Sequence, residues 1–184
     1  MTTDADLFDG AVSYEDHLPL AWLPAAKLPK PFDEVKLAEA NLRTLTSLAQ
    51  IEERSHIGED QNQHDQEIAR LHAKLDALIG VVSAVLPRFV SLPPPSALHL
   101  SWQGIVWTAA DKPPAVDEAG YVDVYLHPGL LKVLRMPARV VRVREREVRA
   151  DFAEVPEICR EALERHVFQR HRRAVADRRT VTRK

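Results

Sequence analysis

Hydrophobic and polar positions change their spacing along this 184-residue chain and divide it into four segments. Residues 1–33 mix prolines with large apolar side chains, and residues 34–86 contain no proline and are rich in helix-forming residues. Apolar and polar positions alternate in residues 87–155, and helical spacing returns in residues 156–184. The first segment predicts an extended, docked arm, because prolines disfavour a helix and apolar residues disfavour free solution.

The second segment predicts one long helix that begins after Asp33, whose carboxylate can accept hydrogen bonds from the first free amides of a helix. Its second half places apolar residues at the a and d positions of successive heptads. Its first half has a seam that is out of phase with this frame, so the apolar stripe must drift near residues 52–58. The seam residues expected to contact other chains are Leu42, Leu45, Ile57, Gln61, His64, Ile68, Leu71, Leu75, Leu78, Val82 and Val85.

A helix of this length cannot bury its stripe on one small domain. It must therefore pair with copies of itself or fold back as a hairpin with a bend near Gly58. We expect self-association, because Gln61 and His64 fit the polar core positions that set the register of an oligomer. Leucine and β-branched residues are mixed at the a and d positions, so the sequence alone leaves two, three or four chains open.

The third segment predicts a small antiparallel β-barrel, since five short stretches alternate or are strand-like and are joined by short loops. Closing the sheet would remove its exposed edges. Pro156 then opens a final helix that reaches about residue 178, so the fold class is α+β. The predicted strands are residues 98–102, 104–108, 121–126, 138–143 and 147–152, and the predicted apolar face of the final helix is Ile158, Cys159, Ala162, Leu163 and Val167.

The composition argues against several kinds of chemistry. The single cysteine, Cys159, cannot form an internal disulfide, and no Cys/His spacing supplies a zinc site, so we expect a cytoplasmic protein without metal or cofactor. The sequence contains no GxSxG, HExxH, GxGxxG or Walker motif, which predicts a non-enzyme. It also has no apolar run of about 18 residues, so no membrane span is expected.

The net charge of −2 conceals an asymmetry between the two parts of the chain. Residues 1–131 carry 9 Lys/Arg against 19 Asp/Glu, whereas residues 132–184 carry 16 against 8. A basic end could bind nucleic acid or another anion, or it could attract the acidic part of a neighbouring subunit. We expect no nucleic-acid partner, because the basic part has few of the aromatic residues on which bases stack. A coiled-coil binder of single strands with an OB-like barrel remains an alternative.

One stretch carries a recognisable motif. The sequence His99-Leu-Ser-Trp-Gln-Gly104 resembles the [D/N]xSxxG element of PilZ domains, and the later strands and final helix are similar to the hairpin and capping helix that close a PilZ barrel. This resemblance covers about residues 88–175. The arm with Leu18-Pro-Leu-Ala-Trp22, followed by a long heptad helix, resembles the atypical, tetramer-forming PilZ proteins of plant-pathogenic gamma-proteobacteria. The resemblance implies a PilZ-like barrel and a tetramer.

The resemblance also implies a ligand, because PilZ domains generally bind cyclic di-GMP through [D/N]xSxxG and an RxxxR motif before the first strand. Two arginines offer forked donors to phosphates and flat cations to guanine rings. This sequence keeps Ser101 and Gly104 but has His99 at the acidic or amide position, and Leu92 stands four residues after Arg88, the only arginine just upstream. Each lost hydrogen bond to a charged group is worth about 1.5–3 kcal/mol, so cyclic di-GMP binding should be weak or absent.

The function expected from these observations is that of an oligomeric, non-enzymatic signalling or adaptor protein that acts through protein partners. Relatives that lack ligand residues imply a role in type IV pilus assembly, motility or virulence signalling, with the barrel surface and the basic final helix as contact sites. The alternative is a cyclic di-GMP receptor with a remodelled site. In that case the ligand would be held by Ser101 and Gly104 together with basic residues from the barrel strands, namely Arg135, Arg139, Arg142 and Arg144.

Overall fold

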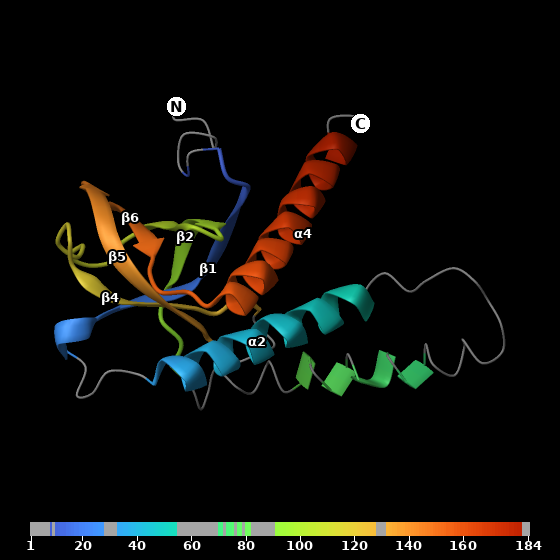
Figure 1. Ribbon diagram of the computed structural model, residues 1–184. Coiled ribbons are helices and arrows are strands. Elements are labelled where there is room, and N and C mark those ends of the chain that lie inside the picture. The colour runs from blue at the N-terminus through green and yellow to red at the C-terminus, as the bar shows by residue number, and fades with distance from the viewer. Residues whose placement is uncertain are drawn as a thin grey trace.

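The computed structural model describes residues 8, 10–27, 33–54, 70–71, 73–75, 77–78, 80–81, 91–127 and 132–181. Within these residues, six strands form a closed antiparallel barrel against which two long helices pack (Figure 1). The elements are β1 (Ser13–Pro24), the short 3-10 helix η1 (Ala25–Lys27), α2 (Glu34–Arg54), β2 (Pro95–Ser101), β3 (Gly104–Thr108), β4 (Ala119–Val124), β5 (Leu134–Arg144), β6 (Glu147–Phe152) and α4 (Glu157–Val181).

The strands follow the order β1-β2-β3-β6-β5-β4 around the barrel, and β1 closes it. The first half of β1 pairs with β2 as far as Pro19, and the second half pairs with β4 as far as Pro24. The predicted arm is therefore extended and docked, but it is a strand of the barrel, which is not confined to residues 87–155. Both prolines lie at the end of a pairing, where a missing amide interrupts the ladder least.

One hydrophobic cluster joins the barrel to both helices. Leu100, Val122 and Val140 are fully buried among the strand residues, and α2 and α4 contribute Leu48 and Leu163 to the same cluster. Burying one such side chain stabilises the fold by about 1.5–3 kcal/mol. The helices are thus part of the core that holds the barrel and are not appendages to it.

The start of α2 agrees with the prediction, since Asp33 Oδ1 accepts hydrogen bonds from the amides of Val35 and Lys36 at 3.1 and 3.2 Å. The seam prediction needs a correction at Leu45. This residue is only 3% exposed and packs in the core of its own chain, because the barrel covers this face of α2. Other parts of the prediction lie outside the described residues, namely the bend at Gly58 and the seam residues Ile57, Gln61, His64, Ile68, Val82 and Val85.

Helix α4 begins one residue after Pro156, whose carbonyl accepts hydrogen bonds from the amides of Cys159 and Arg160. Cys159 is 2% exposed, in agreement with the predicted apolar face, but Ile158 is 58% exposed. The buried stripe consists of residues 159, 163, 166 and 167. It therefore includes His166, which is 5% exposed, and leaves out Ile158. The apolar character of Ile158 alone does not show that its side of the helix faces the core.

Polar groups fix α4 to β1. The hydroxyl of Tyr14 lies 3.3 Å from Nε2 of His166, Asp16 forms an ion pair with Arg170, and His171 Nδ1 lies 2.8 Å from the carbonyl oxygen of Ser13. Burial, together with the positive charges of Arg170 and Arg173, lowers the pKa of His166 to about 4, although the nearby carboxylate of Asp16 acts to raise it. His166 is therefore neutral in the folded chain near neutral pH.

This shift predicts a pH dependence of stability. As the pH falls from about 6.5 to about 4, the unfolded chain gains a proton at position 166 and the folded chain does not, so His166 should destabilise the fold by up to about 3 kcal/mol. We expect the His166→Gln variant to lose less stability than the parent between pH 7 and pH 4.5 in urea unfolding. The control, His17→Gln, changes an exposed histidine of β1 and should keep the parent's pH dependence. Equal pH dependence in the parent and His166→Gln would contradict the assignment.

Candidate functional site

The motif residues 99–104 form the end of β2, a two-residue turn and the start of β3. Leu98 and Leu100 are buried in the barrel core, so His99 between them faces the outer surface. There it pairs in register with Glu15 of β1 on one side and with Val106 of β3 on the other. The structure therefore places His99 on the outside of the barrel, away from the core.

Ser101 and Gly104, the two residues that agree with the motif, are both required by local packing. The side chain of Ser101 is completely buried, and its Oγ accepts a hydrogen bond from the amide of Gln103 at 3.4 Å. A Cβ atom at position 104 would lie 2.4 Å from the carbonyl oxygen of Ala150, so only glycine allows β3 to approach β6 this closely. Neither residue needs a ligand to explain its presence.

A cleft of about 690 Å³ lies beside this turn. It is bounded by the segment that precedes β1, by the turn itself and by the outer side of α4. Both turn residues line it, and α4 contributes two carboxylates and one guanidinium group. A cleft with this charge balance is poorly suited to a dianion. Its principal lining residues are Val12, Trp102, Glu161, Glu164, Arg165 and Phe168.

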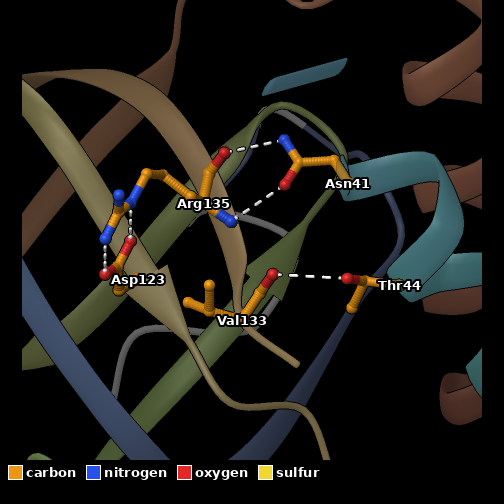
Figure 2. Close-up of polar contacts among 5 residues, drawn as sticks. All are labelled: Asn41, Thr44, Asp123, Val133 and Arg135. Carbon is orange, nitrogen blue, oxygen red and sulfur yellow. Dashed lines mark hydrogen bonds and ion pairs between the residues drawn. The ribbon is translucent and has the colours of Figure 1, made fainter. Parts of the chain in front are cut away.

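A second polar arrangement joins α2 to β5, and Figure 2 shows that Asn41 points its amide group at the backbone of Arg135. Its Nδ2 donates to the carbonyl oxygen of Arg135 at 2.7 Å, and its Oδ1 accepts from the amide of the same residue at 3.0 Å. One turn later, Oγ1 of Thr44 lies 3.3 Å from the carbonyl oxygen of Val133 and 3.0 Å from that of Ala40, and its single hydrogen serves these two acceptors. Strand β6 pairs with β5 only from Ala138 onward, so α2 takes the place of a neighbouring strand at this edge.

The side chain of Arg135 reaches the opposite way, toward β4. Its guanidinium group donates to both carboxylate oxygens of Asp123 at 2.6 and 2.5 Å, and Asp123 is only 5% exposed. The hydrogen bond to Asp123 raises the pKa of Arg135 against the opposing effect of burial. The contacts of Asn41 and Arg135 were not predicted from the sequence. The spacing of Asn41, Thr44, Leu45 and Leu48 is nevertheless that of one buried helix face.

The sequence from residue 45 to residue 180 matches the family model described as the atypical PilZ domain, cyclic di-GMP receptor. The chain belongs to the atypical PilZ family. The resemblance stated from the motif is thereby confirmed, as is the α+β barrel fold with its final helix. Because the family is one of receptor domains, this PilZ chain is a non-enzymatic signalling protein.

A solved structure has the same fold over nearly the whole length of both chains. It is the crystal structure of a pathogenic protein from Xanthomonas campestris, described as a new tetrameric PilZ domain self-assembled via an unusual helical bundle. The TM-score is 0.68 at 24% sequence identity, and the match covers 94% of this chain and 95% of that chain. No curated protein matches the sequence.

The described part of this PilZ chain contains no group of three or more side chains able to hold a metal ion. Among the helices that the structure describes, none is long and apolar enough to cross a membrane.

The strand arginines of this PilZ barrel do not converge on the motif. Arg135 is held by Asp123, Arg142 lies 3.6 Å from a carboxylate oxygen of Glu147, and Arg139 donates to the carbonyl oxygen of Asp117 at 3.0 Å. Arg144 is exposed at the far end of β5. None of the four lines the cleft beside Ser101 and Gly104.

The contact between Asn41 and β5 yields a prediction about stability. Replacing Asn41 by Ala leaves the buried amide and carbonyl of Arg135 without these partners, which should lower the free energy of unfolding by about 1–3 kcal/mol. The control is Ser47→Ala, which changes a partly buried residue of the same helix whose hydrogen bond with Lys132 is exposed to solvent, and it should alter the free energy by no more than about 0.5 kcal/mol. Urea unfolding of both variants measures the difference. Similar values for the two variants would contradict the role given to Asn41.

Proposed function

We propose that this PilZ protein is a cytoplasmic adaptor that self-associates through the segment 34–86 and acts by contacting other proteins. In this proposal it binds cyclic di-GMP weakly or not at all. The observation that supports it most directly is the chemistry beside the motif, where Glu161 and Glu164 line the cleft and the strand arginines lie elsewhere. The family is described as one of cyclic di-GMP receptors, so weak binding would be a departure from it.

Electrostatics supports weak binding. Cyclic di-GMP carries two phosphate charges, and two carboxylates at the rim of a cleft oppose the approach of such a ligand. Before β2 the sequence offers Arg88 and then Leu92 in place of two arginines four residues apart. Ser101 is buried, so its hydroxyl is not presented to a ligand at the surface.

Calorimetric titration of the intact protein with cyclic di-GMP tests this part of the proposal. We expect no saturable heat at micromolar concentrations, because the charged contacts that hold a dianion are missing. Saturable heat would instead favour the alternative function, a receptor with a remodelled site. That receptor would be examined next by replacing the strand arginines, beginning with Arg139→Ala and Arg144→Ala.

Exposed leucines support self-association. Leu71, Leu75 and Leu78 are helical, and in a single chain they are 60%, 46% and 61% exposed. Spacings of four and three residues place them on one helix face, and an apolar stripe of this kind marks an interaction surface. The Xanthomonas campestris protein with the same fold is a tetramer built on a helical bundle, so we propose a tetramer here, with residues 70–81 in the contact and Leu45 in the core of each chain.

Replacing Leu71 and Leu78 by Lys should abolish the assembly, because two charges per chain would have to be buried at the contact. We expect the mass measured by light scattering to fall from about four times to that of one 20.8 kDa chain. A matched control is Ile158→Lys, which changes an apolar residue of α4 that is 58% exposed and should leave the mass unchanged. Circular dichroism would verify that the barrel remains folded. An unchanged mass in the double variant would overturn this part of the proposal.

The cellular process follows from the resemblance alone. We place the adaptor in type IV pilus assembly, motility or virulence signalling, because related PilZ proteins that lack ligand residues act there. A motility assay of cells that carry the double variant at Leu71 and Leu78 would show whether the function requires the assembly.

A further inference from the structure

Helix α4 forms one wall of the cleft beside the motif. Helix α4 carries two stripes, and the stripe of residues 159, 163, 166 and 167 is buried against the rest of the chain. The other stripe is formed by residues 161, 164, 165 and 168, which have the spacing of a single helix face and all line the cleft. One side of the helix is thus used in the core, and the other forms the wall of a surface cleft.

Apolar groups in this cleft are more exposed than a monomeric surface requires. Phe168 is 50% exposed and Val12, on the opposite wall, is 40% exposed. Trp102, in the turn, also lines the cleft and is partly buried. Aromatic side chains at the centre of a pocket are the usual anchors of protein contacts, because they bury a large apolar area with little loss of side-chain freedom.

The charges around the cleft indicate which partner fits. Glu161 and Glu164 are exposed, and the described residues provide no ion-pair partner for either. The neighbouring cation Arg160 lies 5.4 Å above the Trp102 ring and is paired with Glu157, and Arg172 lies 5.9 Å from the centre of the Phe168 ring. Arg165 is the one cation among the lining residues, so two carboxylates face one guanidinium group, and the excess negative charge suits a partner of opposite charge.

We infer that this cleft binds a segment of a partner protein that places an apolar side chain against Trp102 and Phe168 and a lysine or arginine against Glu161 and Glu164. Glu161 and Phe168 are seven residues apart on α4, which is about 10 Å along a helix and about three residues of an extended chain. Glu164 and Phe168 are four residues apart, about 6 Å along the helix, so an extended segment would carry its basic residues about two and three positions from its apolar residue. This inference rests on the proposed adaptor function and names the surface through which it acts.

The test uses a fluorescent nine-residue peptide with one phenylalanine and, two and three positions later, two arginines in a glycine and serine background. A twin peptide carries glutamates in place of the arginines. Fluorescence anisotropy with the intact protein should give saturable binding below about 1 mM for the basic peptide and at least tenfold weaker binding for the acidic twin. Equal binding of the twins, or no binding of the basic peptide at 2 mM, would overturn the inference.

Variants locate the contact. Phe168→Ala, and separately Glu161→Gln combined with Glu164→Gln, should each weaken binding of the basic peptide at least fivefold. The control, Ile158→Ala, changes an exposed apolar residue of the same helix that does not line the cleft, and it should alter binding less than twofold. Fluorine spectra of protein labelled with 5-fluorotryptophan should show a shift of Trp102 and no shift of Trp22. Unchanged binding in the cleft variants, or a shift of Trp22 alone, would contradict the inference.

The same spectra separate this inference from the proposed function. If cyclic di-GMP produces no saturable heat and the basic peptide does not bind, the adaptor function stands and the contact surface lies elsewhere. If micromolar cyclic di-GMP shifts the Trp102 resonance, the proposed function fails, and the cleft belongs to a receptor.

Discussion

The uncovered edge of β5 is the constraint on which the rest of the structure depends. Before Ala138 the strand has no pairing with β6, and its backbone groups still need partners. Asn41 satisfies both groups of Arg135 with one amide, and this fixes α2 on the barrel. With α2 held there, Leu45 and Leu48 enter the core. The thiol of Cys159 donates a hydrogen bond to the carbonyl oxygen of Ala38, and burial raises the pKa of this thiol.

The same attachment connects the fold to the proposed function. The first part of the long apolar segment is committed to the barrel, whereas Leu71 and Leu78 farther along remain exposed in a single chain. Copies that associate through those leucines would carry their barrels in orientations set in part by α2. In the motif region, Ser101 and Gly104 are accounted for by the packing of a turn, and carboxylates line the neighbouring cleft. Two residues of a ligand motif can therefore also serve the packing of the fold.

Much of the fold could be predicted from the sequence, because β2 to β6 and α4 show the periodicities of half-buried elements. Strand β1 was predicted only as an extended arm, because its prolines are unusual in a strand. Its pairing changes from β2 to β4 after Pro19. The seam assignment of Leu45 was wrong because periodicity marks a buried face but not what covers it. His166 and Asn41 were missed because polar residues reveal a buried role only through partners distant in sequence, Tyr14 and Arg135. The candidate site was anticipated at the motif, but its acidic wall comes from α4.

Closure of the barrel by β1 has a consequence for how the protein is made. This strand leaves the ribosome before the other described strands, yet its partner β2 begins 71 positions after β1 ends, and β4 follows later still. Contacts between such distant segments form slowly, because a long loop must be closed first. The helical segment between them is synthesised in the meantime. In the proposed assembly, chains on a polysome would therefore meet through their helices before any one of them has completed its barrel.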